Sequence, residues 1–127
     1  MKLRVARHTN QLDLMVEFYQ EILDICQLGS FENHDAYDGT ILGSKEFDWQ
    51  LEFTRSAEKA IHTPDPDDLL VFYPGAHYHR VLNRLKDSGI ERVKPKNPYW
   101  EKHGYCFYDP DGFMVVIANA PMTKEVS

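Results

Sequence analysis

Residues 105–117 read Tyr-Cys-Phe-Tyr-Asp-Pro-Asp-Gly-Phe-Met-Val-Val-Ile, which is two apolar runs on either side of the polar segment Asp109–Gly112. Aromatic and β-branched residues dominate the runs, and such residues favour strands. In the polar segment, proline presets φ for a turn, aspartate bonds to the local backbone, and glycine accepts a positive φ. The stretch therefore predicts a β-hairpin.

A similar pattern occurs in the first half of the chain. Ile41-Leu42-Gly43-Ser44 leads through a polar turn into Trp49-Gln50-Leu51-Glu52-Phe53. A hairpin that recurs near the end of each half indicates one small unit used twice.

The first half is predicted to run strand, helix and then three strands. Leu3–Arg7 alternate as a strand, and the apolar residues after Asn10, a candidate helix cap, recur at helical spacing. Asp38-Gly39 is typical of a turn before strands at Thr40–Leu42 and Trp49–Phe53. The helical stripe consists of Leu12, Met15, Val16, Tyr19, Ile22 and Leu23.

The second half repeats this order. An apolar strand at Leu69–Tyr73 precedes a helix that ends at Ser88-Gly89, and a short strand is predicted at Ile90–Val93. The segment Pro95–His103 is predicted to be a loop before the final hairpin. The two modules should span about residues 2–55 and 68–120. Between them, the polar segment 56–67 with its two prolines is the predicted linker.

Composition narrows the function classes. The chain has 127 residues, 43% of them hydrophobic, and a net charge of −6, which argues against a nucleic-acid footprint. No apolar run is long enough for a signal peptide or a membrane helix, so we expect a cytoplasmic protein without membrane contact. Cys26 and Cys106 form no disulfide framework and are both predicted to be small buried residues.

Four stretches of the chain together resemble the vicinal oxygen chelate superfamily, which includes glyoxalase I, bleomycin-resistance proteins, fosfomycin-resistance proteins and extradiol dioxygenases. They are Phe18-Tyr19 followed by Ile22-Leu23-Asp24, Leu51-Glu52-Phe53, Ser88-Gly89 after the second helix, and Asp109–Phe113. The resemblance implies an α+β fold of two βαβββ modules, whose curled mixed sheets surround a cleft. It also implies completion of the fold by homodimerisation.

The resemblance places metal ligands on the first and last strands of each module. Those positions fall on Arg4 and Glu52 in the first module, and on or near Leu69 and on Val116 in the second. A guanidinium has no lone pair to donate, and leucine and valine offer no donor atom. Glu52 alone does not hold a catalytic metal, so we expect neither metal nor cofactor. His8 shares strand parity with Arg4 and is the alternative ligand if the alignment slips, although it lies at the strand's end.

An aromatic segment in the second half suggests a ligand site. Tyr99, Trp100 and His103 lie just before a strand, and aromatic walls with a few polar groups suit small molecules. The alternative is that these side chains only cover the end of a sheet. Tyr37 and Trp49 are as compatible with such a wall as with the core.

The sequence thus favours a bleomycin-resistance-like protein that binds a small, partly aromatic or apolar molecule without a metal. The expected ligand contacts are Arg4, His8, Glu52, Tyr99, Trp100 and His103. One alternative is a metal-dependent lyase, isomerase or dioxygenase that resembles glyoxalase I. A second is a metal-free enzyme with Glu52 or His103 as general base. A further hypothesis is that Arg4 and Glu52 form an ion pair where a metal would otherwise lie.

Overall fold

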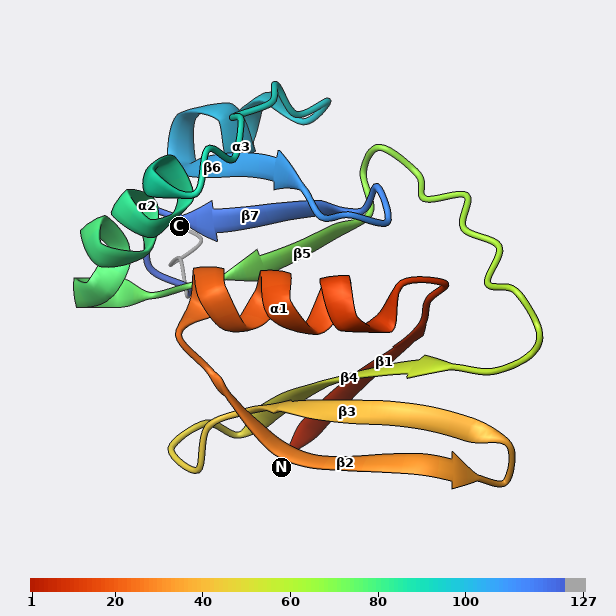
Figure 1. Ribbon diagram of the computed structural model, residues 1–127. Helices are drawn as coiled ribbons and strands as arrows, with labels where there is room; N and C mark the ends of the chain where they lie inside the picture. Colours follow the sequence, from red (N-terminus) through yellow and green to blue (C-terminus); the bar gives the residue numbers. More distant parts are fainter. Residues whose placement is uncertain (123–127) are drawn as a thin grey trace. The chain divides into compact units, whose positions relative to one another are not determined.

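The structure is a computed structural model that describes residues 1–122, and it contains two compact units, one ending at His62 and one beginning at Thr63 (Figure 1). Among these residues, the first unit has a mixed four-stranded sheet with one helix, and the second has a mixed three-stranded sheet with three helical segments. The predicted fold class is therefore confirmed. Within the described residues, no helix is long and apolar enough to span a membrane.

The first unit contains β1 (Leu3–His8), α1 (Leu12–Leu23), β2 (Cys26–His34), β3 (Tyr37–Gly43) and β4 (Trp49–Arg55). Its strand order is β1-β4-β3-β2, with β1 parallel to β4 and the other pairs antiparallel. Helix α1 lies against one face of this sheet (Figure 1). Its apolar stripe packs there, and the Tyr19 ring stacks on the Phe53 ring at 5.2 Å. The helix is thus held by burial of its amphipathic face.

Two local predictions in this unit are wrong. Asp38 and Gly39 lie inside β3, and the turn falls at Asp35 and Ala36, whose φ angles are +50° and +70°. Asp38 instead stabilises that turn from the strand, because its Oδ1 accepts the backbone N–H of Asn33 at 2.8 Å.

The helix cap is also misplaced in the sequence prediction. The N-cap residue is Gln11, not Asn10. The Asn10 side chain instead pairs with the backbone N–H and carbonyl of Ala60, at 2.8 and 3.0 Å. These two bonds hold the segment after β4 against the end of β1, a long-range pairing that helix-capping rules do not consider.

The second unit contains β5 (Leu69–Phe72), η1 (Gly75–His77), α2 (Tyr78–Asp87), α3 (Pro98–His103), β6 (Gly104–Tyr108) and β7 (Met114–Ala118). Its strand order is β5-β7-β6, with β5 parallel and β6 antiparallel to β7. The predicted hairpin is confirmed. Its turn is closed by the Asp109 N–H bonding to the Phe113 carbonyl at 2.9 Å, and Gly112 has a φ of +87°.

The segment between α2 and β6 differs from the prediction. Residues 90–93 do not form a strand: the backbone bond from the Val93 N–H to the Cys106 carbonyl, at 2.8 Å, is not continued into a ladder. Side-chain bonds hold the segment to β6 instead, among them the one from the Tyr105 hydroxyl to the Ile90 carbonyl at 2.8 Å. The predicted loop 95–103 contains the helix α3. Asn97 caps α3 through its side chain and Pro98 occupies the first turn, a pairing typical of a helix start.

The two cysteines have opposite environments. Cys106 is buried as predicted, and that burial raises the pKa of its thiol. Cys26 is exposed at the start of the edge strand β2, so the prediction of a buried Cys26 is wrong. Its apolar neighbours in sequence did not indicate burial, since β2 has almost no buried face.

Candidate functional site

The sheet of the first unit has one face under α1 and one face that carries polar side chains. Leu51 and Phe53 are buried on the helix side. Side chains alternate along a strand, so Gln50, Glu52 and Thr54 lie on the opposite face. The parallel register sets Arg4 beside Gln50, Ala6 beside Glu52 and His8 beside Thr54. The N-terminal strand and the last strand of the unit therefore form one row of polar groups.

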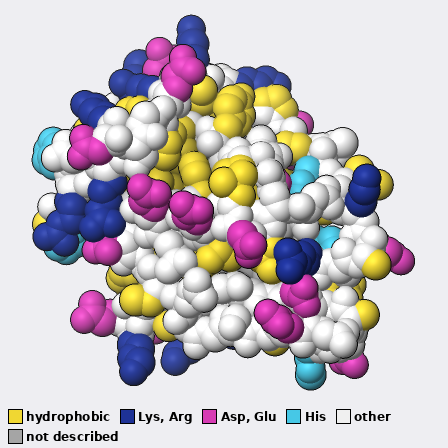
Figure 2. Space-filling model, viewed as in Figure 1, with side chains coloured by type: hydrophobic (Ala, Val, Ile, Leu, Met, Phe, Trp, Pro, Cys, Tyr) yellow, Lys and Arg dark blue, Asp and Glu magenta, His cyan; other side chains and the backbone are white. Residues whose placement is uncertain are grey.

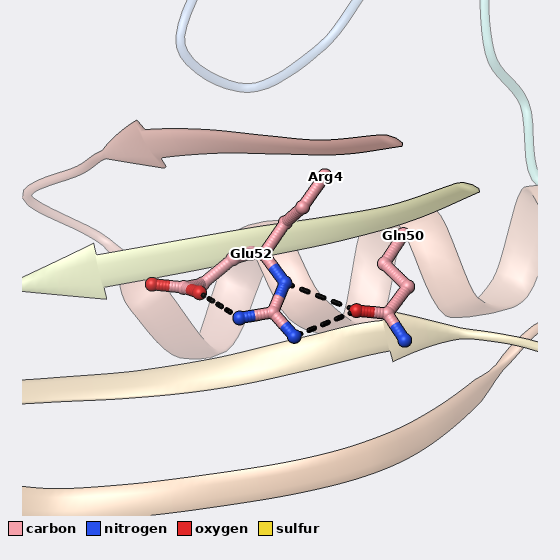
Figure 3. Close-up of polar contacts among 3 residues, drawn as sticks. All are labelled: Arg4, Gln50 and Glu52. Carbon is pink, nitrogen blue, oxygen red and sulfur yellow. Dashed lines mark hydrogen bonds and ion pairs between the residues drawn. The ribbon is translucent and has the colours of Figure 1, made fainter. Parts of the chain in front are cut away.

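Arg4, Gln50 and Glu52 form a connected group, here called the Arg4 centre (Figure 3). The guanidinium donates from Nη1 to Glu52 Oε1 at 3.1 Å, which confirms the expected ion pair. Its Nε and Nη2 both donate to Gln50 Oε1, at 3.0 and 2.7 Å. The two parallel bonds of the guanidinium therefore go to an amide oxygen and not to the carboxylate.

The Arg4 centre is accessible. The Arg4 side chain is 47% exposed and the Glu52 side chain 17%. Solvent screening at this exposure makes the pair weak as a stabilising interaction. A large cost of breaking the pair, as for a well-buried pair, is therefore not expected here, and the groups are available to a ligand.

His8 lies on the same face at the end of β1. Its Nδ1 is 2.9 Å from Thr54 Oγ1, and its Nε2 is 3.1 Å from Ser56 Oγ and 3.2 Å from the Glu58 carbonyl. Because a carbonyl only accepts, Nε2 carries a proton in this arrangement. His8 thus fastens the segment after β4 to β1, and its ring also lies edge-on to Tyr37 at 5.6 Å.

Apolar side chains border this polar row. On the neighbouring strand β3, Gly39, Ile41 and Gly43 lie opposite the β4 residues of this row. An added Cβ at Gly39 would lie within 3 Å of the Phe31 ring, and one at Gly43 would lie 2.9 Å from the Leu28 side chain. The glycines therefore let these two side chains from β2 approach the sheet, which gives the face apolar as well as polar surface.

The aromatic residues predicted in the second unit gather on α3. The Tyr99 ring lies 4.9 Å from the Trp100 ring and 4.5 Å from the His103 ring, and Tyr73 lies 6.4 Å from Trp100. All of these side chains are partly exposed. Arg92 supports the end of the helix by donating from Nη2 to the carbonyls of Glu101 and Gly104, at 3.0 and 3.1 Å.

The four positions at which the superfamily resemblance puts metal ligands do not fit a cation in this chain. Arg4 brings a positive charge to the first, and that charge already engages Glu52. Val116 is fully buried in a cluster with Cys106 and Met114, and Leu69 packs against it. No group of three or more His, Cys, Asp or Glu side chains able to hold a metal ion occurs among residues 1–122.

A separate groove of about 610 Å³ lies between α1 and the β2–β3 hairpin. Carboxylates along α1 border it, and Figure 2 shows such groups over this helix. They are Asp13, Glu17 and Glu21, which follow one another at four-residue spacing. The groove is on the helix side of the sheet and contains none of the predicted ligand contacts, so we place the candidate site on the opposite face.

Gln50 is the residue of the Arg4 centre that sequence reasoning missed. It lies two residues before Glu52, and this spacing alone puts both side chains on one face of β4. The Tyr37 ring contacts the ring of His8, which lies on this face. The Trp49 ring instead stacks on the Phe47 ring, with 5.2 Å between the ring centroids. The two aromatic residues with an undecided role thus have different surroundings.

Comparisons with known proteins match both halves of the chain. Residues 3–54 match the YycE-like N-terminal domain and residues 67–119 the YycE-like C-terminal domain. The uncharacterised protein YycE of Bacillus subtilis is 39% identical over 122 residues, covering 94% of this chain and 88% of that protein. The crystal structure of YycE superposes with a TM-score of 0.84 at 38% identity, over 96% of this chain and 91% of YycE.

More distant structures share the fold. Glyoxalase I of Leishmania major has a TM-score of 0.70 at 18% identity, covering 94% of this chain and 86% of the enzyme. The fosfomycin-resistance protein FosX of Listeria monocytogenes, in a complex with Mn(II), has a TM-score of 0.68 at 13% identity. That match covers 94% of this chain and 91% of FosX.

Proposed function

Because the chain belongs to the YycE-like family and has the glyoxalase/fosfomycin-resistance fold, we propose that it binds a small, partly aromatic or apolar molecule without a metal ion. The observation that carries this proposal is the Arg4 centre. A guanidinium, an amide and a carboxylate occupy the face where the resemblance implies a cation, and they bond to one another.

Ligand contact is proposed for two surfaces, each within its own unit. In the first unit these are Arg4, His8 and Glu52, which lie on the open sheet face beside apolar side chains. In the second unit these are Tyr99, Trp100 and His103 on α3, whose partly exposed rings offer stacking surface. Mixed polar and aromatic surfaces of this kind suit a small organic molecule better than a hydrated ion.

We further propose that the protein acts as a homodimer in the cytoplasm. Large apolar side chains are exposed in both units, among them Leu3, Phe47 and Tyr108, and a second copy could cover part of this surface. Both cysteines are free, which suits a reducing compartment.

Metal independence is tested by elemental analysis of protein purified without chelator. We expect no stoichiometric zinc, nickel, iron or manganese. Stoichiometric metal that is lost in Glu52→Ala and kept in Glu46→Ala, an exposed glutamate of the same unit, would contradict the proposal and favour the metal-dependent enzyme.

Ligand binding is tested by screening small aromatic compounds and following tryptophan fluorescence. Trp100→Phe should fold normally and weaken the binding of hits that contact α3, while Trp49→Phe serves as the matched control. If hits bind equally well to both variants, and in the wild type quench the fluorescence of Trp49 alone, then α3 only covers the end of the sheet. Turnover of a hit that is lost in Glu52→Gln or His103→Gln would favour the general-base alternative.

A further inference from the structure

The Arg4 guanidinium keeps unused hydrogen-bond donors. A guanidinium has five N–H groups. Gln50 and Glu52 engage Nε, one N–H of Nη2 and one N–H of Nη1. One N–H therefore remains on each terminal nitrogen, and no group among residues 1–122 accepts it. Glu52 and Gln50 hold the guanidinium from two sides, so the remaining donors are oriented without a ligand's help (Figure 3).

Acceptor and donor groups flank these unused N–H groups. Glu52 uses Oε1 for Arg4, and its Oε2 points away from the guanidinium with no hydrogen bond from any described residue (Figure 3). Gln50 uses Oε1, which leaves its Nε2 amide group available in the same part of the structure. The centre thus has unused donors on Arg4 and Gln50 and an unused carboxylate acceptor on Glu52.

The charge of the centre decides between a neutral and an anionic ligand. Arg4 is positive and Glu52 negative, and their direct contact at 3.1 Å leaves the pair without net charge. An anion at the free N–H groups would lie next to the Glu52 carboxylate and be repelled by it. A neutral carbonyl can accept from Arg4 without that repulsion, and an N–H beside the carbonyl can donate to Glu52 Oε2.

From these contacts we infer that the Arg4 centre recognises a neutral carboxamide-type group, with its carbonyl on Arg4 and its N–H on Glu52. This inference rests on the proposed function, since it assumes that the open face of the first unit binds a ligand. It adds the chemical class of the group that is bound there. The apolar side chains of Leu28 and Ile41 nearby would contact the hydrocarbon part of such a ligand.

Benzamide and benzoate form a matched pair of probes for the experiment. They share a ring and a shape, but benzamide is neutral with a donor, whereas benzoate is an anion that only accepts. Each is titrated into isotope-labelled protein while the NMR signals of the Gln50 side-chain amide and the Arg4 Nε–H are followed. We expect benzamide to bind the wild type about fivefold more tightly than benzoate, the size of one net hydrogen bond.

Glu52→Gln should reverse this preference. Without the carboxylate, Arg4 has an unbalanced positive charge, so benzoate should bind more tightly than benzamide. Glu46→Gln, an exposed change elsewhere in the unit, should keep the wild-type order. Arg4→Met should lose both probes, and it provides a second reading if Glu52→Gln does not fold.

Two results would overturn the inference. One is a wild-type protein that binds benzoate as tightly as benzamide through Arg4, which leaves the proposed function standing with an anionic ligand. The other is the absence of any shift at Arg4 and Gln50 with both probes. In that case the proposed function is decided by the compound screen and by Trp100 fluorescence, which do not depend on the Arg4 centre.

Discussion

Arg4 divides its guanidinium between an amide and a carboxylate, and it does so at a half-exposed position. These contacts therefore orient the Arg4 side chain without adding much to the stability of the fold. The contacts set the direction of the side chain, while solvent screening keeps the energy of the charge pair small. The residue is therefore better suited to present donors to a ligand than to hold the fold together.

A double-mutant cycle measures how strongly Arg4 and Glu52 are coupled. We expect Arg4→Met, Glu52→Gln and the double variant to give a coupling free energy of unfolding below about 1 kcal/mol in urea. The Arg55–Asp38 pair, at 3.0 Å with side chains 49% and 29% exposed, is a matched control. A coupling of about 3 kcal/mol for Arg4 and Glu52 would mean that the pair is buried in solution.

Asp38 should make the stability depend on acid pH. The backbone N–H of Asn33, and then the Arg55 guanidinium, lower the pKa of this carboxyl. A depressed pKa contributes stability above the ordinary aspartate value of about 3.9, and the contribution is lost as the pH falls through the folded-state pKa. The difference in stability between wild type and Asp38→Asn should therefore be constant at neutral pH and vanish in stronger acid.

Urea midpoints measured from neutral pH into strong acid test this. Asp35→Asn is the control, because Asp35 lies in the same turn, and asparagine tolerates its positive φ. A wild-type advantage over Asp38→Asn that persists in strong acid would show that the effect is not due to the charge.

At the scale of single elements, strand β6 depends on a residue without a side chain. A Cβ at Gly104 would lie 2.6 Å from Val116 Cγ1 and 3.1 Å from the Ile117 carbonyl. Val116 is fully buried, so it has no free space into which to move. The close approach of β6 to β7, and with it the start of the hairpin, therefore requires glycine here.

Gly104→Ala should destabilise the protein by about 1–3 kcal/mol, the usual cost of overpacking a core. Gly29→Ala is the matched control, because Gly29 is also in a strand and a Cβ there would meet nothing within 4 Å. We expect Gly29→Ala to change stability by less than about 0.5 kcal/mol. Thermal unfolding of both variants gives the comparison, and equal effects would contradict the steric explanation.

At the scale of the whole molecule, the chain divides into two compact units of different composition. The first has four strands and presents the polar row of β1 and β4. The second has three strands, and the corresponding positions are filled by the apolar cluster around Val116. The positions on the first and last strands thus carry polar side chains in the first unit and apolar, packed side chains in the second.

Self-association is the prediction that concerns the complete protein. Sedimentation at micromolar concentration should give a species of about twice the 14.8 kDa mass of one chain. Dilution should dissociate it at a concentration set by its affinity. A single 14.8 kDa species over the whole micromolar range would rule out the homodimer.

Patterns that are local in the chain were sufficient for much of the fold. The apolar stripe of α1 and the Asp109–Gly112 hairpin follow from periodicity and turn chemistry, because both depend on neighbours within a few residues. The Arg4–Glu52 pair was also predictable, since parallel pairing of the first and last strands brings the two residues to one face.

Features that depend on distant partners were not predictable in this way. The Arg4 guanidinium donates two hydrogen bonds to Gln50 and not to Glu52, because the register of β1 on β4 sets Arg4 beside Gln50. Asn10 bonds to Ala60 and does not cap α1, and residues 90–93 stay outside the sheet because their backbone bond to it is not continued into a ladder. Periodicity and turn signals describe each segment alone, whereas hydrogen bonds and burial depend on which segments the tertiary structure brings together.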